Sequence, residues 1–172
     1  MAKILLTGVT GFIGSNLLKN RIFNEALSIG RTRPVSCKNF KYAPLDGIYD
    51  YSKLLYNIEV VVHMAGKSKI MNKTSMKSLS DYRKINTFAT LNLARQAAGC
   101  GVKRFVFLSS VKVNGESTSK FDGNIIFTNN DMPDPQNDYA ISKFEAEKGL
   151  LDIAAETGLE VVILRLPLVS GH

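Results

Sequence analysis

The chain has 172 residues, of which 45% are hydrophobic and 22% charged, a composition typical of one folded globular domain rather than of a disordered or fibrous chain. Its formal net charge is +7, but the lysines between Lys67 and Lys84 lie among polar residues without interleaved aromatic side chains, so we favour a solvated surface that attracts an anionic ligand over a nucleic-acid interface. Since no apolar run approaches the roughly 20 residues of a membrane span and no secretory leader is evident, we expect a cytoplasmic protein that does not enter a membrane.

The segment from Lys3 to Leu18 has the pattern of a strand, a tight turn and a helix. Its apolar run ends at Gly8, and the residues after Gly11 follow a helical period. Glycine has a purpose at each position: Gly8 lets the chain reverse, Gly11 lets backbone touch a pyrophosphate, and Gly14 lets helix and strand pack closely. The start of the helix also favours an anion, so the segment predicts a dinucleotide site; the alternative is an ordinary strand-to-helix turn.

The second predicted strand, Ala26 to Gly30, ends in a basic segment that contains Arg31 and Arg33 before Pro34. In a dinucleotide-binding fold this position meets the adenosine ribose, where a carboxylate bonds the 2′-hydroxyl of NAD and an arginine suits the 2′-phosphate of NADP. Because two arginines and no carboxylate stand there, the sequence favours NADP over NAD. The alternative is that both arginines are loop residues that face solvent.

Two further strands are predicted before the middle of the chain. Asn39 to Leu45 forms the third, and it ends at Asp46, which either meets the adenine edge or starts a turn. The β-branched run Glu59 to His63 predicts a buried strand, whose terminal histidine we expect to bond nearby backbone. The small residues Ala65 and Gly66 follow, and they leave room for a ligand at the carboxyl end of the sheet.

The next segments are a helix, a strand and a long loop. A long amphipathic helix is predicted from Ser80 to Gly99, with Asn86 near its apolar face. The buried strand Arg104 to Ser109 again ends in small polar residues. From Gly115 to Asn137 the chain is rich in Ser, Thr, Asn, Asp, Gly and Pro, and loops of this length are usually binding loops or lids.

The last elements complete an alternation of strands and helices. A helix capped by Asn137 is predicted to reach about Thr157, and Glu160 to Arg165 to form the final strand. We therefore expect an α/β fold of the Rossmann type, a doubly wound parallel sheet with helices on both faces, in one domain over residues 1–172. Ligands of such a sheet bind outside the carboxyl ends of its strands.

Tyr139 and Lys143 are the strongest candidates for chemistry. They are four residues apart on a predicted helix and therefore share a face, where an ammonium group would favour the phenolate form of the tyrosine. Ser110 supplies a hydroxyl at the end of the fifth strand that could bond a substrate oxygen and Tyr139, with Ser109 as the alternative. The only two cysteines lack metal-ligand spacing, and no metal site is predicted.

Several of these segments recur together, in order and spacing, in a known family. They are Thr7–Gly14 (TGVTGFIG), His63–Gly66 (HMAG), Asn86, Ser109–Gly115 (SSVKVNG), Tyr139–Lys143 (YAISK) and Arg165–Pro167 (RLP). In them the chain resembles the extended short-chain dehydrogenase/reductases, and most of all their NAD(P)-dependent nucleotide-sugar epimerases of the UDP-glucose 4-epimerase type and the 4-keto-sugar reductases of surface-polysaccharide synthesis. The resemblance covers nearly the whole chain.

The resemblance implies a catalytic triad of Ser110, Tyr139 and Lys143. Tyr139 would take a proton from a sugar hydroxyl while hydride passes from the same carbon to the nicotinamide; return of the hydride to the other face gives an epimer, and one-way transfer gives a reduction. Together with the residue patterns described above, the resemblance also implies a cofactor site. Its predicted residues are Gly8, Gly11, Phe12, Ile13, Gly14, Arg31, Asp46, Ala65, Gly66, Asn86, Ser109, Tyr139, Lys143 and Pro167.

The chain departs from the family in three places. Asn114 replaces an aromatic residue, Gly66 replaces an alanine, and the C-terminal domain that holds the nucleotide sugar is largely absent from these 172 residues. The rival interpretations are therefore a dinucleotide-binding sensor or interaction module without turnover, and a truncated fragment that exposes apolar surface. The family also implies a possible homodimer through the helices Ser80 to Gly99 and Asn137 to Thr157. The identity of the sugar stays open.

Overall fold

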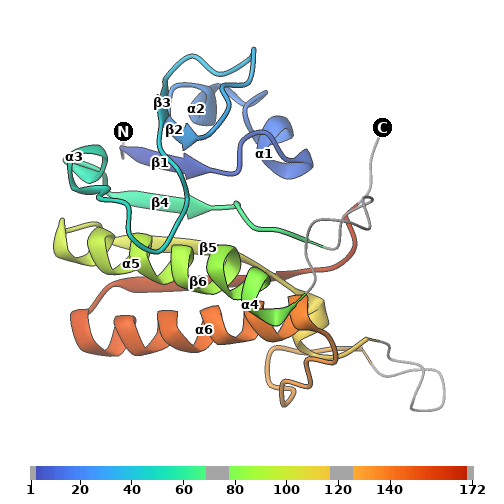
Figure 1. The fold of residues 1–172 in the computed structure, drawn as a ribbon. Helices are drawn as coiled ribbons and strands as arrows, with labels where there is room; N and C mark the ends of the chain where they lie inside the picture. The colour runs from blue at the N-terminus through green and yellow to red at the C-terminus, as the bar shows by residue number, and fades with distance from the viewer. Residues whose placement is uncertain (1–2, 69–77, 117–125, 170–172) are drawn as a thin grey trace.

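In the described residues, six strands form one sheet in which every neighbouring pair is parallel (Figure 1). The computed structural model describes residues 3–68, 78–116 and 126–169. Residues 117–125 of the predicted loop, and the lysines among residues 69–77, lie outside this part. The order is β3-β2-β1-β4-β5-β6, with bounds β1 (Ile4–Thr7), β2 (Leu27–Gly30), β3 (Phe40–Tyr42), β4 (Val60–His63), β5 (Arg104–Ser110) and β6 (Glu160–Leu166). The chain reverses its direction of winding between β1 and β4, which confirms the Rossmann-type prediction.

The helical segments are α1 (Phe12–Leu17), α2 (Arg21–Asn24), α3 (Ser52–Leu55), α4 (Leu79–Tyr82), the π-helix η1 (Arg83–Phe88), α5 (Ala89–Gly99), the 3₁₀ turn η2 (Val111–Val113) and α6 (Asp138–Thr157). The predicted helix Ser80 to Gly99 is therefore one run with a π-helical middle. The predicted cap of α6 is confirmed, since Asn137 Oδ1 accepts the N–H of Ala140 at 2.9 Å. At the other end Gly158 adopts φ +74°, which favours glycine.

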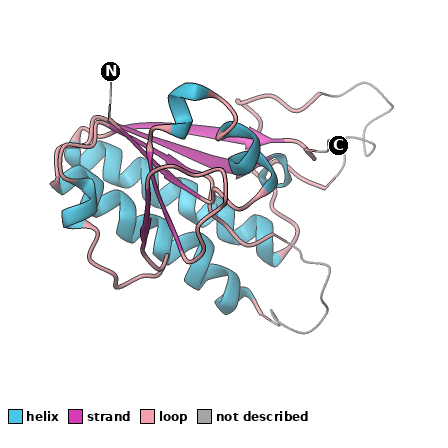
Figure 2. Ribbon diagram, turned by 90° about the horizontal axis from the view of Figure 1, so that it is seen from above, coloured by secondary structure: helices cyan, strands magenta, loops and turns pink. Residues whose placement is uncertain are grey.

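Two apolar clusters hold the sheet between its helices. On one face, buried residues such as Val61 and Phe105 pack against Leu93 of α5 and Leu150 of α6, and each such side chain contributes about 1.5–3 kcal/mol. The long helices α5 and α6 lie side by side there (Figures 1 and 2). On the other face a smaller cluster centred on Leu6 lies beside α1 and α2.

The prediction of helices on both faces holds for only part of the sheet. Val62, Val106 and Val162 are register partners across β4, β5 and β6, so their side chains share the face of the smaller cluster. On β6, however, Val162 is 37% exposed and Leu164 is 42% exposed. We call this region, Val106 and Leu108 of β5 with Val162 and Leu164 of β6, the open sheet face.

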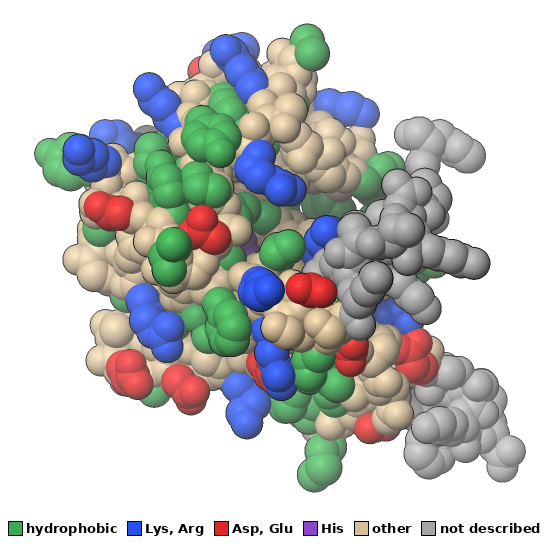
Figure 3. All heavy atoms as spheres, viewed as in Figure 1, with side chains coloured by type: hydrophobic (Ala, Val, Ile, Leu, Met, Phe, Trp, Pro, Cys, Tyr) green, Lys and Arg blue, Asp and Glu red, His purple; other side chains and the backbone are tan. Residues whose placement is uncertain are grey.

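The surface charges are mixed. On the side shown in Figure 3, Lys and Arg side chains are dispersed among Asp and Glu rather than gathered into one basic patch. Several of them form ion pairs, such as Lys103 with Glu59 at 3.0 Å and Arg104 with Glu160 at 2.6 Å. This pattern agrees with the predicted solvated surface. In the part of the chain that the structure describes, no helix is both long and apolar enough to cross a membrane.

Candidate functional site

The glycine turn after β1 is built as the sequence predicts at two of its three positions. Gly8 has φ +73°, and a Cβ there would lie 2.5 Å from the backbone nitrogen of Ala65. A Cβ on Gly14 would lie 2.4 Å from Gly8 O and 2.7 Å from Val9 Cα. Only glycine fits either position, because the obstructing atoms belong to backbone. Gly11 meets only Gly8 O, at 3.3 Å, and its contact with a pyrophosphate stays a prediction.

A chain of hydrogen bonds joins this turn to the end of β4. The Ala65 N–H donates to Thr7 Oγ1 at 3.2 Å, and Thr7 Oγ1 lies 2.8 Å from His63 Nδ1. On the other side His63 Nε2 lies 2.9 Å from Thr90 Oγ1, which donates to Asn86 O at 2.8 Å. Because Thr90 uses its proton on that carbonyl, His63 must donate from Nε2 and accept at Nδ1. The histidine is bonded, as expected, but to two threonine hydroxyls rather than to backbone.

The burial of His63 makes the protein sensitive to acid. Desolvation, with a smaller contribution from the charge of Lys143, lowers the pKa of His63 to about 3. The unfolded chain binds this proton near its ordinary pKa of 6.5, so unfolding takes up a proton between these values. We therefore expect the free energy of unfolding to fall by about 1.4 kcal/mol for each unit as the pH drops from 6.5 towards 5.

Urea denaturation at a series of pH values measures this slope. His63→Asn should flatten it, while His172→Asn, which changes the only other histidine, should leave it as in the parent chain. Equal slopes in the parent and in His63→Asn would show that His63 is not the group that titrates.

Asn86 ties the loop after β4 to helix α6. Its side chain accepts the Lys67 N–H at 2.7 Å and donates to Lys67 O and to Ser142 Oγ, each at 3.0 Å. It is fully buried within the π-helical turn, a type of turn that often occurs at functional sites. A Cβ on Gly66 would lie 3.4 Å from Asn86 Oδ1 and 3.6 Å from Lys143 Nζ, so Gly66 leaves the ammonium group uncovered on this side.

The predicted triad residues meet at the carboxyl end of β5. Lys143 is buried, and its Nζ donates to Leu108 O at 2.6 Å and lies 3.9 Å from the ring centre of Phe107. Burial lowers the pKa of Lys143 to about 7, and the charge of Glu147 acts in the opposite direction. Tyr139 is hydrogen-bonded to Ser110 through their side chains.

The electrostatics of Tyr139 differ from the expectation. An adjacent ammonium was predicted to favour the phenolate, but burial raises the pKa of Tyr139 above its ordinary value, and the neighbouring Tyr82 adds to the rise. The hydrogen bond with Ser110 only partly offsets it. The reason is that the desolvation of a phenolate outweighs the available stabilising contacts, while the Lys143 ammonium is directed at a backbone carbonyl.

The structure also separates the two candidate serines. Ser109 is buried and donates its hydroxyl proton to Glu147 Oε1. Ser110 is only partly buried, and its Oγ accepts the Lys112 N–H at 3.3 Å while it interacts with Tyr139. The geometry therefore favours Ser110 over Ser109 as the hydroxyl next to a substrate oxygen.

The two arginines after β2 have different surroundings. Arg33 is folded back on its own loop, where it donates to Cys37 O at 3.0 and 3.2 Å and to Lys38 O at 3.2 Å. Arg31 follows the last residue of β2 and is exposed. The loop carbonyls therefore occupy the Nε and Nη2 groups of Arg33, whereas Arg31 makes none of these contacts, and the role of both arginines towards a phosphate stays a prediction.

The remaining predicted residues lie at the same edge of the sheet. Phe12 and Ile13 open α1, and Pro167 follows β6. Asp46 forms a turn, since its Oδ1 accepts the N–H of Ile48 at 3.0 Å and that of Tyr49 at 2.7 Å. Of the two interpretations offered for Asp46, the turn is the one that its contacts support.

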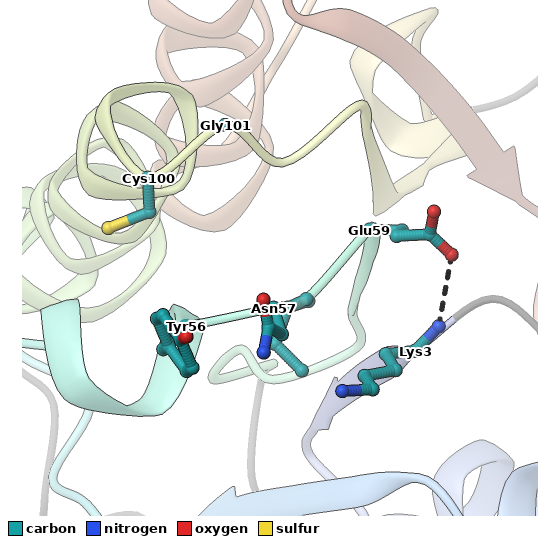
Figure 4. Close-up of a pocket in the computed structure, with 7 residues that line it drawn as sticks. Lys3, Tyr56, Asn57, Glu59, Cys100 and Gly101 are labelled. Carbon is teal, nitrogen blue, oxygen red and sulfur yellow. Dashed lines mark hydrogen bonds between the residues drawn. The ribbon is translucent and has the colours of Figure 1, made fainter.

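A separate hollow lies at the opposite edge, at the amino ends of β1 and β4 (Figure 4). Its lining includes Lys3, Tyr56 and Cys100, and the Lys3 N–H donates to Glu59 Oε2 at 3.3 Å. None of the predicted site residues lines it. It is far from the carboxyl ends where ligands of such sheets bind, so we do not assign it to the site.

Sequence reasoning gave no role to the most densely bonded side chain near the triad, Glu147. This buried carboxylate accepts hydrogen bonds from Ser109 and from Arg165. Its position four residues after Lys143 was visible in the sequence, but its partner in β6 follows only from the packing of α6 on the sheet.

Comparisons with known proteins identify the family to which the chain belongs. The model of the "NAD dependent epimerase/dehydratase family" matches residues 4–172. A UDP-glucose 4-epimerase of Vibrio cholerae is 40% identical over 173 residues, which cover 98% of this chain and 52% of that protein. The structure of a UDP-glucuronic acid 4-epimerase from Bacillus cereus in complex with NAD is 25% identical, has a TM-score of 0.78, and is matched over 98% of this chain and 57% of that one.

A relative with a different name also matches. Methionine adenosyltransferase 2 subunit beta of Bos taurus is 29% identical over 180 residues, covering 99% of this chain and 48% of that protein. The chain thus spans about half the length of the curated relatives that it resembles.

Proposed function

Because the chain belongs to the NAD dependent epimerase/dehydratase family, we propose that it carries the dinucleotide site and the catalytic residues of a nucleotide-sugar epimerase. The observation that supports the proposal is that Ser110 interacts with Tyr139, and Lys143 bonds Leu108 O, at the carboxyl end of the same strand, with Gly66 beside Lys143 Nζ. The Vibrio cholerae relative supports UDP-glucose as the first substrate to test. One-way reduction of a keto sugar is the alternative reaction at the same site.

The residues at this edge fit a dinucleotide. Lys143 has three N–H donors and gives one to Leu108 O, so donors are left for ribose hydroxyls beside Gly66. Gly8 and Gly14 allow the backbone of the turn to pack without side chains. When bound, the nicotinamide supplies the hydride acceptor and a positive charge.

Tyr139 is the proposed proton acceptor. Its phenol must lose a proton before it can take one from the sugar hydroxyl, and burial opposes that loss. Positive charge close to the ring is therefore required, and in the proposal the bound nicotinamide and a protonated Lys143 supply it. Ser110 orients the substrate oxygen towards the phenol, and the same phenol returns the proton when the hydride comes back to the other face.

Arg31 is the residue on which we base a test of the choice between NAD and NADP, because it is exposed directly after β2. We propose NAD as the working cofactor, as in the Bacillus cereus neighbour, with Arg31 as the group that admits the 2′-phosphate of NADP. Arg31→Ala should weaken NADPH binding about tenfold, the value of one charge-assisted hydrogen bond, and leave NADH binding unchanged. Fluorescence titration with both nucleotides measures the two dissociation constants.

Arg33→Ala is the matched control for this titration. It removes an equal charge two residues away but breaks contacts within the loop, so it should leave the ratio of the two dissociation constants unchanged. If Arg33→Ala changes that ratio as much as Arg31→Ala does, overall charge rather than a local contact selects the nucleotide.

A second candidate function is a dinucleotide-binding module without turnover. The relative that is a subunit of an adenosyltransferase favours it, and so does the match to only about half of each relative. Incubation of the chain with NAD and UDP-glucose, followed by proton NMR of the sugar, separates the candidates. Formation of the 4-epimer supports the enzyme, whereas nucleotide binding with an unchanged sugar supports the module or a fragment.

A further inference from the structure

A buried ionic cluster lies directly behind the triad. Glu147 is 2% exposed, and its carboxylate accepts from Arg165 Nη2 at 2.6 Å and from Arg165 Nε at 3.1 and 3.2 Å. Ser109 Oγ donates to the same carboxylate. Arg165 also donates to Asn114 Oδ1 at 3.2 Å, and Asn114 Nδ2 donates to Thr128 O at 3.2 Å.

This cluster connects the elements that carry the proposed catalytic residues. Three successive residues of β5 make different contacts. Leu108 O accepts a hydrogen bond from Lys143 Nζ, and Ser109 donates to Glu147. Ser110 interacts with Tyr139. Glu147 stands one helical turn after Lys143 on α6, so it fixes the register between the helix and the strand at the position where the triad forms.

The cluster also shapes the electrostatic surroundings of Lys143. The titratable groups on the neighbouring elements are Tyr139 and Glu147 on α6, His63 on β4 and Arg165 on β6, and of these His63 and Glu147 interact electrostatically with Lys143. Burial favours the neutral forms of Tyr139 and His63, and Arg165 is paired with Glu147. Glu147 raises the pKa of Lys143, against the larger lowering effect of burial.

We propose that Glu147 is a positioning residue of the candidate site, which fixes the turn of α6 that carries Lys143 against the strand end that carries Ser110, without touching substrate or cofactor. The relevance of this role to catalysis rests on the proposed function. If the Glu147–Arg165 pair were purely structural, its removal would change only the stability of the chain, and buried ion pairs often contribute little to stability. The additional consequence of the proposal is a change in the titration of a different residue, Lys143.

The test is the titration of Lys143 in Glu147→Gln, followed by NMR of lysine labelled with ¹³C at Cε. The resonance is assigned by its loss in Lys143→Met. Glutamine keeps the shape and can still bond Ser109 but has no charge, so the midpoint should fall by about one pH unit, as expected when an opposite charge one helical turn away is removed. An unchanged midpoint in a folded variant would overturn the proposal.

Glu145→Gln is the matched control, because it lies on the same helix, and its carboxylate pairs with Arg83 at 2.5 Å near the surface. It should leave the midpoint of Lys143 unchanged, and an equal shift in this variant would also overturn the proposal. Glu147→Asp retains the charge and should bring the midpoint back towards that of the parent chain.

A double variant serves as the control for loss of folding. Glu147→Gln leaves the Arg165 guanidinium buried without its partner, which alone can destabilise the chain. Glu147→Gln combined with Arg165→Gln removes both charges, and the midpoint of Lys143 should still lie below that of the parent. A double variant that folds and titrates like the parent would sink the proposal.

These measurements need neither nucleotide nor sugar. If the midpoint falls in Glu147→Gln while the parent chain turns over no sugar, the positioning role is supported and the proposed enzymatic function is contradicted. Failure of the positioning proposal can therefore be told apart from failure of the proposed function. In an active chain, Glu147→Gln should lower kcat about tenfold, with KM changed less than twofold, because the residue does not contact the substrate.

Discussion

Tyr139→Phe is expected to lower the rate of sugar epimerisation at least about 10³-fold while leaving the dissociation constant for NAD within about twofold. The substitution removes one hydroxyl and keeps the ring, so packing beside Tyr82 is retained, with ring centres 6.1 Å apart. Without the hydroxyl the sugar proton has no acceptor, whereas a nucleotide held by the glycine turn and Lys143 keeps its contacts. Single-turnover appearance of NADH absorbance and nucleotide fluorescence measure the two quantities separately.

Tyr82→Phe is the control for this experiment. It removes the same hydroxyl from the neighbouring ring, and it should leave the rate within about threefold because the phenol of Tyr82 has no proposed part in proton transfer. Normal turnover in Tyr139→Phe would refute the catalytic assignment, and an equal loss in Tyr82→Phe would point to a general disturbance of the site.

Gly14→Ala is expected to have the largest effect on stability. A methyl group at this position would lie 2.4 Å from Gly8 O and 2.7 Å from Val9 Cα. Both are backbone atoms, which cannot move aside as the end of a flexible side chain can. We expect a loss of about 3 kcal/mol or more, equivalent to a fall in Tm of about 6–12 °C for a domain of this size. Thermal denaturation followed by circular dichroism measures it.

Gly99→Ala supplies the comparison. A Cβ there meets nothing within 4 Å, and the residue closes helix α5. Since alanine is favoured over glycine in helices by about 0.5–1 kcal/mol, this variant should be as stable as the parent or slightly more so. Comparable losses in the two variants would show that the close packing of α1 on β1 is not what Gly14 provides.

Local patterns in the sequence predict most of the fold. The run of β-branched residues at β4 and the helical spacing after Asn137 each depend on residues close together in the chain, and both elements form where expected. The glycine turn is predictable for the same reason. The common face of Tyr139 and Lys143 follows from helical geometry alone. The position of Ser110 at the end of the fifth strand made it a candidate partner beside Ser109, and only the resemblance of several motifs joined it to Tyr139 and Lys143 as a triad.

The remaining features depend on contacts between distant segments. Nothing near Asn86 signals a π-helical turn, and its partner Ser142 is 56 residues away. Two other contacts likewise form only in the folded chain. They are the hydrogen bonds from Arg33 to carbonyls of its loop and the ion pair of Glu147 with Arg165. The direction of the pKa shift of Tyr139 was missed because burial is a property of the assembled sheet and helices.

The strand β6 is the outer member of the sheet, so the N–H and C=O groups along its free side lack a strand partner in the part of the chain described here. The same strand carries Arg165, and the open sheet face lies along it. A strand that pairs along this margin would satisfy these backbone groups and cover the rim of the open sheet face, so β6 is the place where another segment or molecule can add to the sheet.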